Sequence, residues 1–316
     1  MKKLDESSII KIFQSKLGNK KFISEDVETI NLGKTKIIAK TDTLVESTDI
    51  PPKMKLMDAA RKSIVACVSD FASKGVRPQY GIISVNLPKN ISRLEIVDIA
   101  KGFKKAANEY DIKILGGDTN AGKEIVFNVS IFGNSDKIVP RKGSKEGDLI
   151  FVTGPFGYTT IGLELLLGKR KGKGKFIEKS IRSFINPKPR LNFGLKNKKY
   201  FSSSMDSSDG LSTTLNEISK QSGSKFLINI IPVRKDLENY VKKHKMNLNE
   251  LVFHGGEEYE FVFTVPPKYK KIIEKNASIL KTPIIQIGHV TSGKGVFVNN
   301  TKNYVNLKDL GWKHFG

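Results

Sequence analysis

The first half of the chain alternates short apolar runs with longer stretches in which apolar residues recur every three or four positions. The short runs predict strands, and the longer stretches predict amphipathic helices. The clearest helix covers residues 53–74, where Leu56, Ile64 and Phe71 share one face and Gly75 provides a natural C-terminal stop. The other elements predicted in this half are strands at 36–40, 80–86, 112–115 and 125–129 and a helix at 91–108.

A change of composition at residues 140–147, Pro-Arg-Lys-Gly-Ser-Lys-Glu-Gly, predicts a domain boundary. The two domains would then cover residues 1–139 and 140–316, close to the size of two ordinary domains. Both halves predict α/β (α+β) units built from mixed sheets with flanking helices. In the second half we expect helices near 158–168, after 187–190 and at 209–221, and strands at 149–154, 226–230, 260–264 and 284–287.

The amino-acid composition excludes several classes of protein and of site. The 316 residues include one cysteine, Cys67, which excludes an internal disulfide framework and a cysteine-based zinc site. No run of about 18 apolar residues predicts a membrane span. The N-terminal stretch also lacks the apolar segment of a signal peptide. We therefore expect no membrane association and a cytoplasmic location.

The formal charge of +22 raises the question of nucleic-acid binding. Only 8 of the 54 basic residues are Arg, the side chain that best reads bases and phosphates. The lysines are spread along the chain, apart from a cluster in the predicted loop 168–175. This distribution indicates a general lysine bias, so we expect no nucleic-acid partner, although a positive surface would attract anionic phosphates.

The familiar nucleotide-binding and metal-binding motifs are absent. The chain has no Gly-x-x-x-x-Gly-Lys-Ser/Thr loop and no Gly-x-Gly-x-x-Gly after a strand, which excludes P-loop and Rossmann assignments. Its four histidines show no His-Glu-x-x-His spacing, so we expect surface or packing roles for them.

Six aspartates lie among small residues across most of the chain, where we expect turns. Mg²⁺ prefers hard oxygen ligands, keeps several waters, and commonly bridges carboxylates to substrate phosphates. Carboxylates gathered from several strand ends would therefore suit phosphoryl transfer without a P-loop. The six residues are Asp26, Asp42, Asp70, Asp118, Asp206 and Asp209.

Local context adds weight to some of these aspartates. Asp70 lies near the end of the 53–74 helix, where the helix dipole disfavours a negative charge, so it requires a compensating cation. Asp118 directly follows two glycines that would let the backbone approach a ligand closely. For the segment 206–209 two interpretations stand side by side: Ser207 or Ser208 caps the helix that begins near residue 209, or that helix N-terminus helps to hold phosphate while Asp206 and Asp209 hold metal.

Taken together, seven strings resemble the thiamine-monophosphate kinase family of the aminoimidazole-ribonucleotide synthetase-like superfamily. They occur in the family's order and cover the chain from about residue 24 to its end. The strings are Thr-Asp-Thr-Leu-Val-Glu at 41–46, Val-Ser-Asp-Phe-Ala-Ser-Lys-Gly-Val-Arg-Pro at 68–78, Gly-Gly-Asp-Thr at 116–119, Asp-Leu-Ile-Phe-Val-Thr-Gly at 148–154, Pro-Lys-Pro-Arg at 187–190, Asp-Ser-Ser-Asp-Gly-Leu at 206–211 and Gly-Gly-Glu-Glu-Tyr-Glu at 255–260.

The resemblance implies transfer of the γ-phosphoryl group of ATP to thiamine monophosphate, and a two-domain subunit that forms a homodimer through its N-terminal half. It implies several Mg²⁺ ions and a nucleotide site, with Asp42, Asp118, Arg141 and Asp209 taking part in catalysis. The implied Mg²⁺ ligands are Asp26, Thr41, Asp42, Asp70, Asp118, Asp206 and Asp209; the implied nucleotide contacts are Gly117, Asp118, Arg141 and Ser208; and the implied substrate contacts are Asp49, Glu257 and Trp312.

The chain departs from the family pattern at three places. Ser24-Glu25-Asp26 stands where Gly-Asp-Asp is common, which keeps both carboxylates. Lys40 stands where serine is common, and an ammonium group cannot ligate a metal. Asp49-Ile50 stands where a His-Phe pair is common, which affects expectations for acceptor binding.

Two alternatives remain open at this stage. One is another ATP-dependent member of the superfamily, above all aminoimidazole-ribonucleotide synthetase. Members that depend on a reactive cysteine fit less well, because Cys67 lies on the predicted buried helix face and the chain ends His-Phe-Gly. The other is a basic nucleic-acid-binding protein, which would show salt-sensitive DNA retention without nucleotide turnover. The aspartate set argues against a degenerate ATP-sensing dimer.

Overall fold

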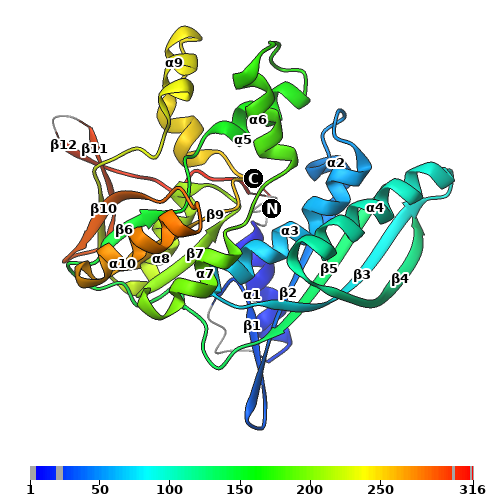
Figure 1. Ribbon diagram of the computed structural model, residues 1–316, viewed down its shortest axis with the longest axis horizontal. Coiled ribbons are helices and arrows are strands. Elements are labelled where there is room, and N and C mark those ends of the chain that lie inside the picture. Colours follow the sequence, from blue (N-terminus) through cyan, green and yellow to red (C-terminus); the bar gives the residue numbers. More distant parts are fainter. Residues whose placement is uncertain (1–4, 19–23, 301–302, 314, 316) are drawn as a thin grey trace.

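The computed structural model describes residues 5–18, 24–300, 303–313 and 315, and its strands form two mixed sheets (Figure 1). The first sheet has the order β1-β2-β5-β3-β4, in which β3 and β4 are parallel and the other neighbours are antiparallel. Its elements are α1 (Glu6–Lys16), β1 (Glu28–Leu32), β2 (Thr35–Val45), α2 (Glu46–Asp49), α3 (Leu56–Lys74), β3 (Pro78–Pro88), α4 (Arg93–Tyr110), β4 (Lys113–Gly122) and β5 (Val126–Asn134).

The second sheet has the order β12-β11-β8-β10-β6-β9-β7 and is antiparallel except where β11 pairs with β8. Helices α5, α6 and α9 project from this half at the top of Figure 1. Its elements are β6 (Leu149–Val152), α5 (Tyr158–Leu166), α6 (Lys175–Ile185), α7 (Leu191–Asn197), η1 (Lys198–Tyr200), β7 (Ser203–Ser207), α8 (Leu211–Ser222), β8 (Lys225–Ile228), α9 (Lys235–Lys243), η2 (Glu250–His254), β9 (Glu260–Val265), η3 (Pro267–Tyr269), α10 (Lys270–Ile279), β10 (Ile285–Thr291), β11 (Gly295–Asn300) and β12 (Asn303–Asn306).

Helix α3 is buried along most of its length, because it packs between the two halves of the molecule. On one side it contacts β2, β5 and α4, and on the other it contacts α7, β7 and β9. One apolar core therefore runs through it, from Phe71 of α3 and Val129 of β5 to Phe151, Phe261 and Phe263 of the second sheet. Gly75 ends the helix in the left-handed conformation (φ 64°), as predicted from the sequence.

Several local predictions were wrong because long-range pairing extends the strands. Asp42 lies inside β2, which continues to Val45 along its partner β5. Asp118 lies inside β4 and pairs with Ser84 of β3, so it does not occupy a turn. Neither Ser207 nor Ser208 caps α8; Gly210 is the N-cap, without a side-chain bond.

Several elements of the second half were not predicted, among them β7, α6, α9 and α10. Strand β7 contains Asp206, but its sequence is rich in serine and lacks an apolar run. Its serines are buried. Ser203 Oγ lies 2.7 Å from Ser144 Oγ, Ser204 Oγ donates to the Ser73 carbonyl of α3, and the Ser204 carbonyl accepts from Lys74 at 2.7 Å. Helix α6 directly follows the basic loop 168–175 and buries Ile177 and Phe184.

Candidate functional site

A cavity of about 420 Å³ opens between the two halves, beside the C-terminal part of α3. Residues from β2, α3, the loop before α8, the loop before β9 and the C-terminal segment line it. Eight of the residues singled out in the sequence lie on its wall: Asp42, Asp49, Asp70, Asp206, Ser208, Asp209, Glu257 and Trp312.

Asp70 projects from the last turns of α3 and is paired with Lys40, whose Nζ lies 2.9 Å from its Oδ2. The cation that this helix position requires thus comes from β2. Burial raises the pKa of Asp70 to about 7, although Lys40 acts in the opposite direction. Burial disfavours the Lys40 ammonium, but Asp70 and Asp42 outweigh it and raise the pKa of Lys40.

Asp206 approaches from β7 and accepts a hydrogen bond from Ser69 Oγ of α3. Burial, followed by the nearby Asp70 charge, raises the pKa of Asp206 well above its ordinary value. Among the described residues, no three acidic, histidine or cysteine side chains converge closely enough to hold a metal by themselves. The carboxylates are instead spread over one wall, which fits ions whose coordination is completed by water and phosphate oxygens.

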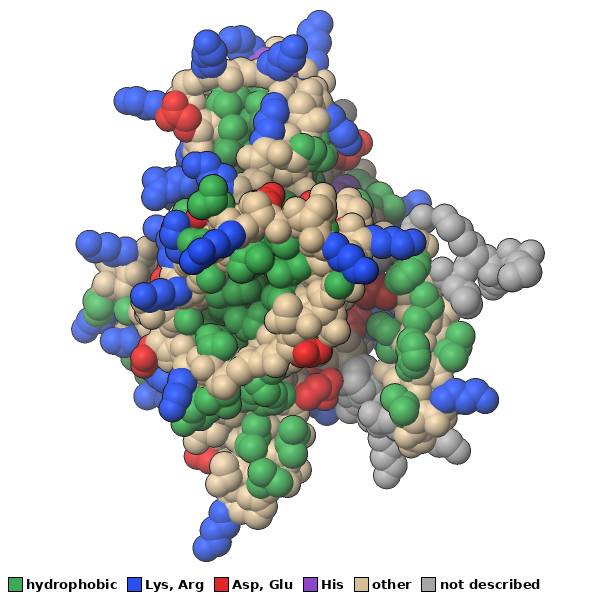
Figure 2. Space-filling view, turned by 90° about the vertical axis from the view of Figure 1, so that its right-hand side faces the viewer, with side chains coloured by type: hydrophobic (Ala, Val, Ile, Leu, Met, Phe, Trp, Pro, Cys, Tyr) green, Lys and Arg blue, Asp and Glu red, His purple; other side chains and the backbone are tan. Residues whose placement is uncertain are grey.

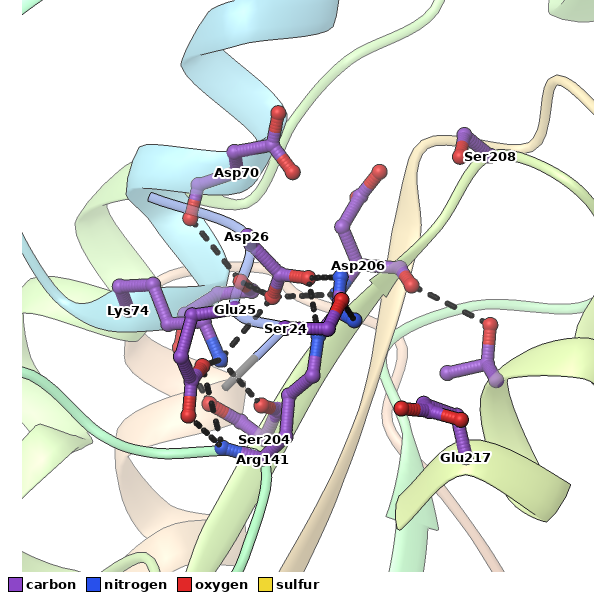
Figure 3. Close-up of polar contacts among 12 residues, drawn as sticks. Ser24, Glu25, Asp26, Asp70, Lys74, Arg141, Ser204, Asp206, Ser208 and Glu217 are labelled. Atoms are coloured by element: carbon purple, nitrogen blue, oxygen red, sulfur yellow. Dashed lines mark hydrogen bonds and ion pairs between the residues drawn. The ribbon is translucent and has the colours of Figure 1, made fainter. Parts of the chain in front are cut away.

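Asp26 and Arg141 lie beside this wall and are paired with each other (Figure 3). Arg141 Nε donates to Asp26 Oδ1 at 2.8 Å, and Lys74 Nζ lies 3.0 Å from Asp26 Oδ2. Burial opposes ionisation, but Lys74 and Arg141 outweigh it and lower the pKa of Asp26. Lys74 is fully buried and also contacts Glu25 at 2.9 Å, so this network fixes the segment before β1 against α3.

Thr41, Gly117 and Asp118 do not line the central cavity. Thr41 is bonded to Ser130 of β5 at 3.1 Å, on the sheet face opposite to α3. Strand register places Asp118 in one row with Ser84 and Asn128. Gly117 and Asp118 line a second, open hollow of about 740 Å³ between β4 and α4. Figure 2, viewed from this side of the molecule, shows apolar side chains gathered around a hollow.

Position 117 of β4 has room only for glycine. A Cβ at this position would lie 1.6 Å from the Ile83 carbonyl oxygen of the neighbouring strand. The glycine before Asp118 therefore has a packing reason that is independent of any ligand.

Another part of the cavity lining combines a carboxylate with aromatic rings. Glu257 is ion-paired with Lys62, a fully buried residue of α3, and the Lys62 ammonium lies 3.7 Å from the ring centroid of Phe184. Trp312 is 57% exposed and is anchored by its backbone N–H, which donates to the Asp209 carbonyl at 2.8 Å. A flat cationic ring would find both charge and stacking partners here.

Two residues in this part of the cavity lining have strained backbone conformations. Glu257 (φ 67°) and Tyr259 (φ 52°) both adopt left-handed conformations that side-chain-bearing residues rarely take. Such outliers cluster at ligand sites, where the surrounding structure holds them in place.

Sequence reasoning missed several residues of the cavity. Phe184 lies on α6, which was not predicted, so no sequence signal connected it to the site. His254 also lines the cavity, where its Nδ1 is 2.9 Å from Ser212 Oγ, and burial lowers its pKa. The Gly-Gly-Glu-Glu string that follows His254 was a usable signal.

Comparisons with known proteins agree on one family. A family model described as "AIR synthase related protein, N-terminal domain" matches residues 24–134. A thiamine-monophosphate kinase of Nitrosopumilus maritimus is 66% identical over 315 residues, covering 100% of both chains. The crystal structure of thiamine monophosphate kinase from Aquifex aeolicus is similar with a TM-score of 0.82 and 28% identity, covering 92% of this chain and 96% of that one.

A second solved structure, "AaThiL complexed with AMPPCP and TMP", is similar over 100% of this chain and 98% of its own. Its TM-score is 0.88 and its sequence identity is 29%. At this coverage the similarity extends over both halves of the molecule.

Proposed function

Because the chain belongs to the thiamine-monophosphate kinase family, we propose that it transfers the γ-phosphoryl group of ATP to thiamine monophosphate, giving thiamine diphosphate and ADP. The observation that carries this proposal is full-length identity of 66% to a relative of that name. The cavity supports it, because its aspartates suit phosphate-bound cations, and Glu257 with the aromatic rings of Phe184 and Trp312 suits a flat cationic ring. Thiamine monophosphate carries both a phosphate group, which such cations bind, and a flat cationic ring.

The donor set fits Mg²⁺. Asp42, Asp70, Asp206 and Asp209 offer hard carboxylate oxygens to the cavity. Its described lining contains no cysteine, and the one histidine there, His254, is bonded through Nδ1 to Ser212. These residues would hold the ions. When bound, Mg²⁺ would neutralise the phosphate oxygens of donor and acceptor.

The chain's own residues would position the acceptor. Glu257 and Trp312 would hold the thiamine moiety, with Phe184 as a further aromatic surface. Asp49 is held by the Val45 N–H at 2.7 Å and lies on the same cavity wall. The acceptor phosphate oxygen is already an anionic nucleophile, so no strong general base is required. Catalysis would then consist of positioning and charge stabilisation.

The nucleotide would be held at the edge of the acidic wall. Ser208 precedes the N-terminus of α8, where backbone N–H groups favour phosphate. Arg141 would contact the nucleotide by exchanging part of its Asp26 pairing for phosphate oxygens, which would also free Asp26 as a metal ligand.

A homodimer would account for the residues that lie outside the cavity. Tyr80, Ile82 and Leu115 of β3 and β4 are between 40% and 57% exposed, and β4 is an edge strand of the first sheet, paired with β3 on its inner side. A second copy covering this sheet would bury these side chains and enclose Asp118. We therefore propose that the N-terminal domain, residues 1–139, carries the dimer contact, and that Thr41, Gly117 and Asp118 act in the assembled dimer.

The test is an assay of purified chain with ATP, Mg²⁺ and thiamine monophosphate, with the products separated by chromatography. We expect thiamine diphosphate and ADP in equal amounts. ATP binding without thiamine diphosphate would contradict the proposal, and aminoimidazole-ribonucleotide precursors would then be the next acceptors to try. Asp118→Asn with near-normal turnover at saturating Mg²⁺ would contradict the role of Asp118.

A further inference from the structure

Lys40 places a positive charge inside the carboxylate cluster. Along β2 the side chains of Ile38, Lys40, Asp42 and Leu44 alternate onto one face. Ile38 and Leu44 are buried, while Lys40 and Asp42 between them line the central cavity. The Lys40 ammonium lies 2.9 Å from Asp70 Oδ2, and its side chain is 26% exposed. It is therefore held against the carboxylates and does not extend into solvent.

This ammonium has no cationic neighbour on the cavity wall. Among the described residues that line the cavity, Lys40 is the single lysine or arginine, facing Asp42, Asp70, Asp206 and Asp209. The other buried cations nearby are paired elsewhere: Lys74 and Arg141 with Asp26, and Lys62 with Glu257. Among the described residues that line the cavity, Lys40 is thus the cation paired with its carboxylates.

An ammonium and a divalent ion compete for the same oxygen. Mg²⁺ binds oxygen at about 2.0–2.1 Å. An ion on the Asp70 oxygen that Lys40 contacts would thus lie within about 5 Å of the ammonium, at a distance where like charges repel strongly in a partly buried site. Lys40 and an ion on that oxygen therefore exclude each other.

We propose that Lys40 is a built-in cation that takes the place of one divalent ion between Asp42 and Asp70. The inference rests on the proposed function for the presence of Mg²⁺, but it concerns the number of ions and not the reaction. The chain would bind one ion fewer than its carboxylates could accommodate. It would also keep Asp70 paired when Mg²⁺ is scarce.

The test counts bound Mn²⁺, which shares the oxygen preference of Mg²⁺ and can be followed by electron paramagnetic resonance. The full chain is titrated with Mn²⁺ in the presence of thiamine monophosphate and a non-hydrolysable ATP analogue. We expect Lys40→Ser to bind one more Mn²⁺ per chain than wild type, and Lys40→Arg to match wild type. Lys36→Ser removes an exposed lysine from the same strand and is the matched control. Equal counts for wild type and Lys40→Ser would overturn the proposal.

A second measurement needs no variant and covers the case in which Lys40→Ser fails to fold. Crystals of wild type with Mn²⁺ give anomalous peaks at each ion. We expect Lys40 to remain on Asp70, with no ion bound to the Asp70 oxygen it contacts. An ion bridging Asp42 and Asp70, with Lys40 turned away, would overturn the proposal. Both readouts are independent of turnover, so a chain that binds ions as expected but transfers no phosphoryl group would refute the proposed function and leave this inference standing.

Discussion

Glu258 offers a direct test of the electrostatics around the cavity. The residue is 8% exposed, and its Oε1 accepts a hydrogen bond from the Gly157 N–H at the start of α5. Burial raises the pKa of Glu258 to about 8, against the lowering effect of hydrogen bonds from Thr159 and Gly157. The folded protein therefore retains a proton on Glu258 at pH 7, whereas the unfolded chain has released it.

This difference in protonation between the folded and unfolded states makes the free energy of unfolding depend on pH. Between the ordinary pKa of 4.5 and the folded value of about 8, the folded state binds more protons, so the free energy of unfolding falls as pH rises. Each pH unit contributes about 1.4 kcal/mol, which gives a cost of about 3 kcal/mol at pH 7. Glu258→Gln removes the titration and keeps an oxygen that can accept from Gly157. We expect the variant to be more stable than wild type by about 3 kcal/mol at pH 7.

Urea unfolding at pH 5, 7 and 8.5 measures this effect, with exposed Glu178→Gln as the control. The stabilisation by Glu258→Gln should be below about 1 kcal/mol at pH 5 and should grow with pH until it levels off near pH 8. A difference that is the same at all three pH values would refute the reasoning. It would show that hydrogen-bond geometry at α5, and not the burial of a charge, controls stability at this position.

Three further predictions concern the site and the proposed assembly. Asp42→Asn should lower kcat by about a hundredfold or more and leave the melting temperature nearly unchanged. Steady-state ADP release measures kcat, and thermal unfolding measures the melting temperature. A variant that loses both activity and thermal stability would indicate a structural role for Asp42. Arg141→Met leaves a buried carboxylate short of its partner and should lower the free energy of unfolding by about 3 kcal/mol in urea titrations, whereas exposed Lys142→Met should have no effect. Ile82→Glu should convert the dimer to a monomer in sedimentation velocity, and Leu94→Glu, an equally drastic change at a 78% exposed position of α4, should not; a monomeric wild type would refute the proposed assembly.

The sequence predicted those features that depend on local physics. The helix over α3 and its stop at Gly75 followed from periodicity and from the freedom of glycine at positive φ. The position of Asp70 against the helix dipole required a cation, and the structure supplies one at 2.9 Å. The pattern around Asp70 could not identify the residue that supplies this cation, because Lys40 lies 30 residues away on another element.

The predictions that were wrong concern features that depend on contacts between distant segments. Asp118 appeared to sit in a turn because two glycines precede it, but pairing with β3 draws the whole segment into a strand. Strand β7 has serines where a buried strand usually has valine or isoleucine. The serine hydroxyls bond groups on α3 and in the 140–148 segment, for example Ser204 with the Ser73 carbonyl and Ser203 with Ser144, which no single-segment pattern reveals.

The apolar core that runs through α3 limits how substrates can reach the cavity. Many two-lobed enzymes open by swinging one lobe away from the other about a hinge. Here such a swing would separate Phe71 and Val129 from Phe151, Phe261 and Phe263 and expose them to water. The two halves should therefore melt in one transition, and entry and release should depend on the exposed rim of the cavity, where Leu310 and Trp312 are more than half exposed. Exchange of substrate and product would then require no separation of the two halves.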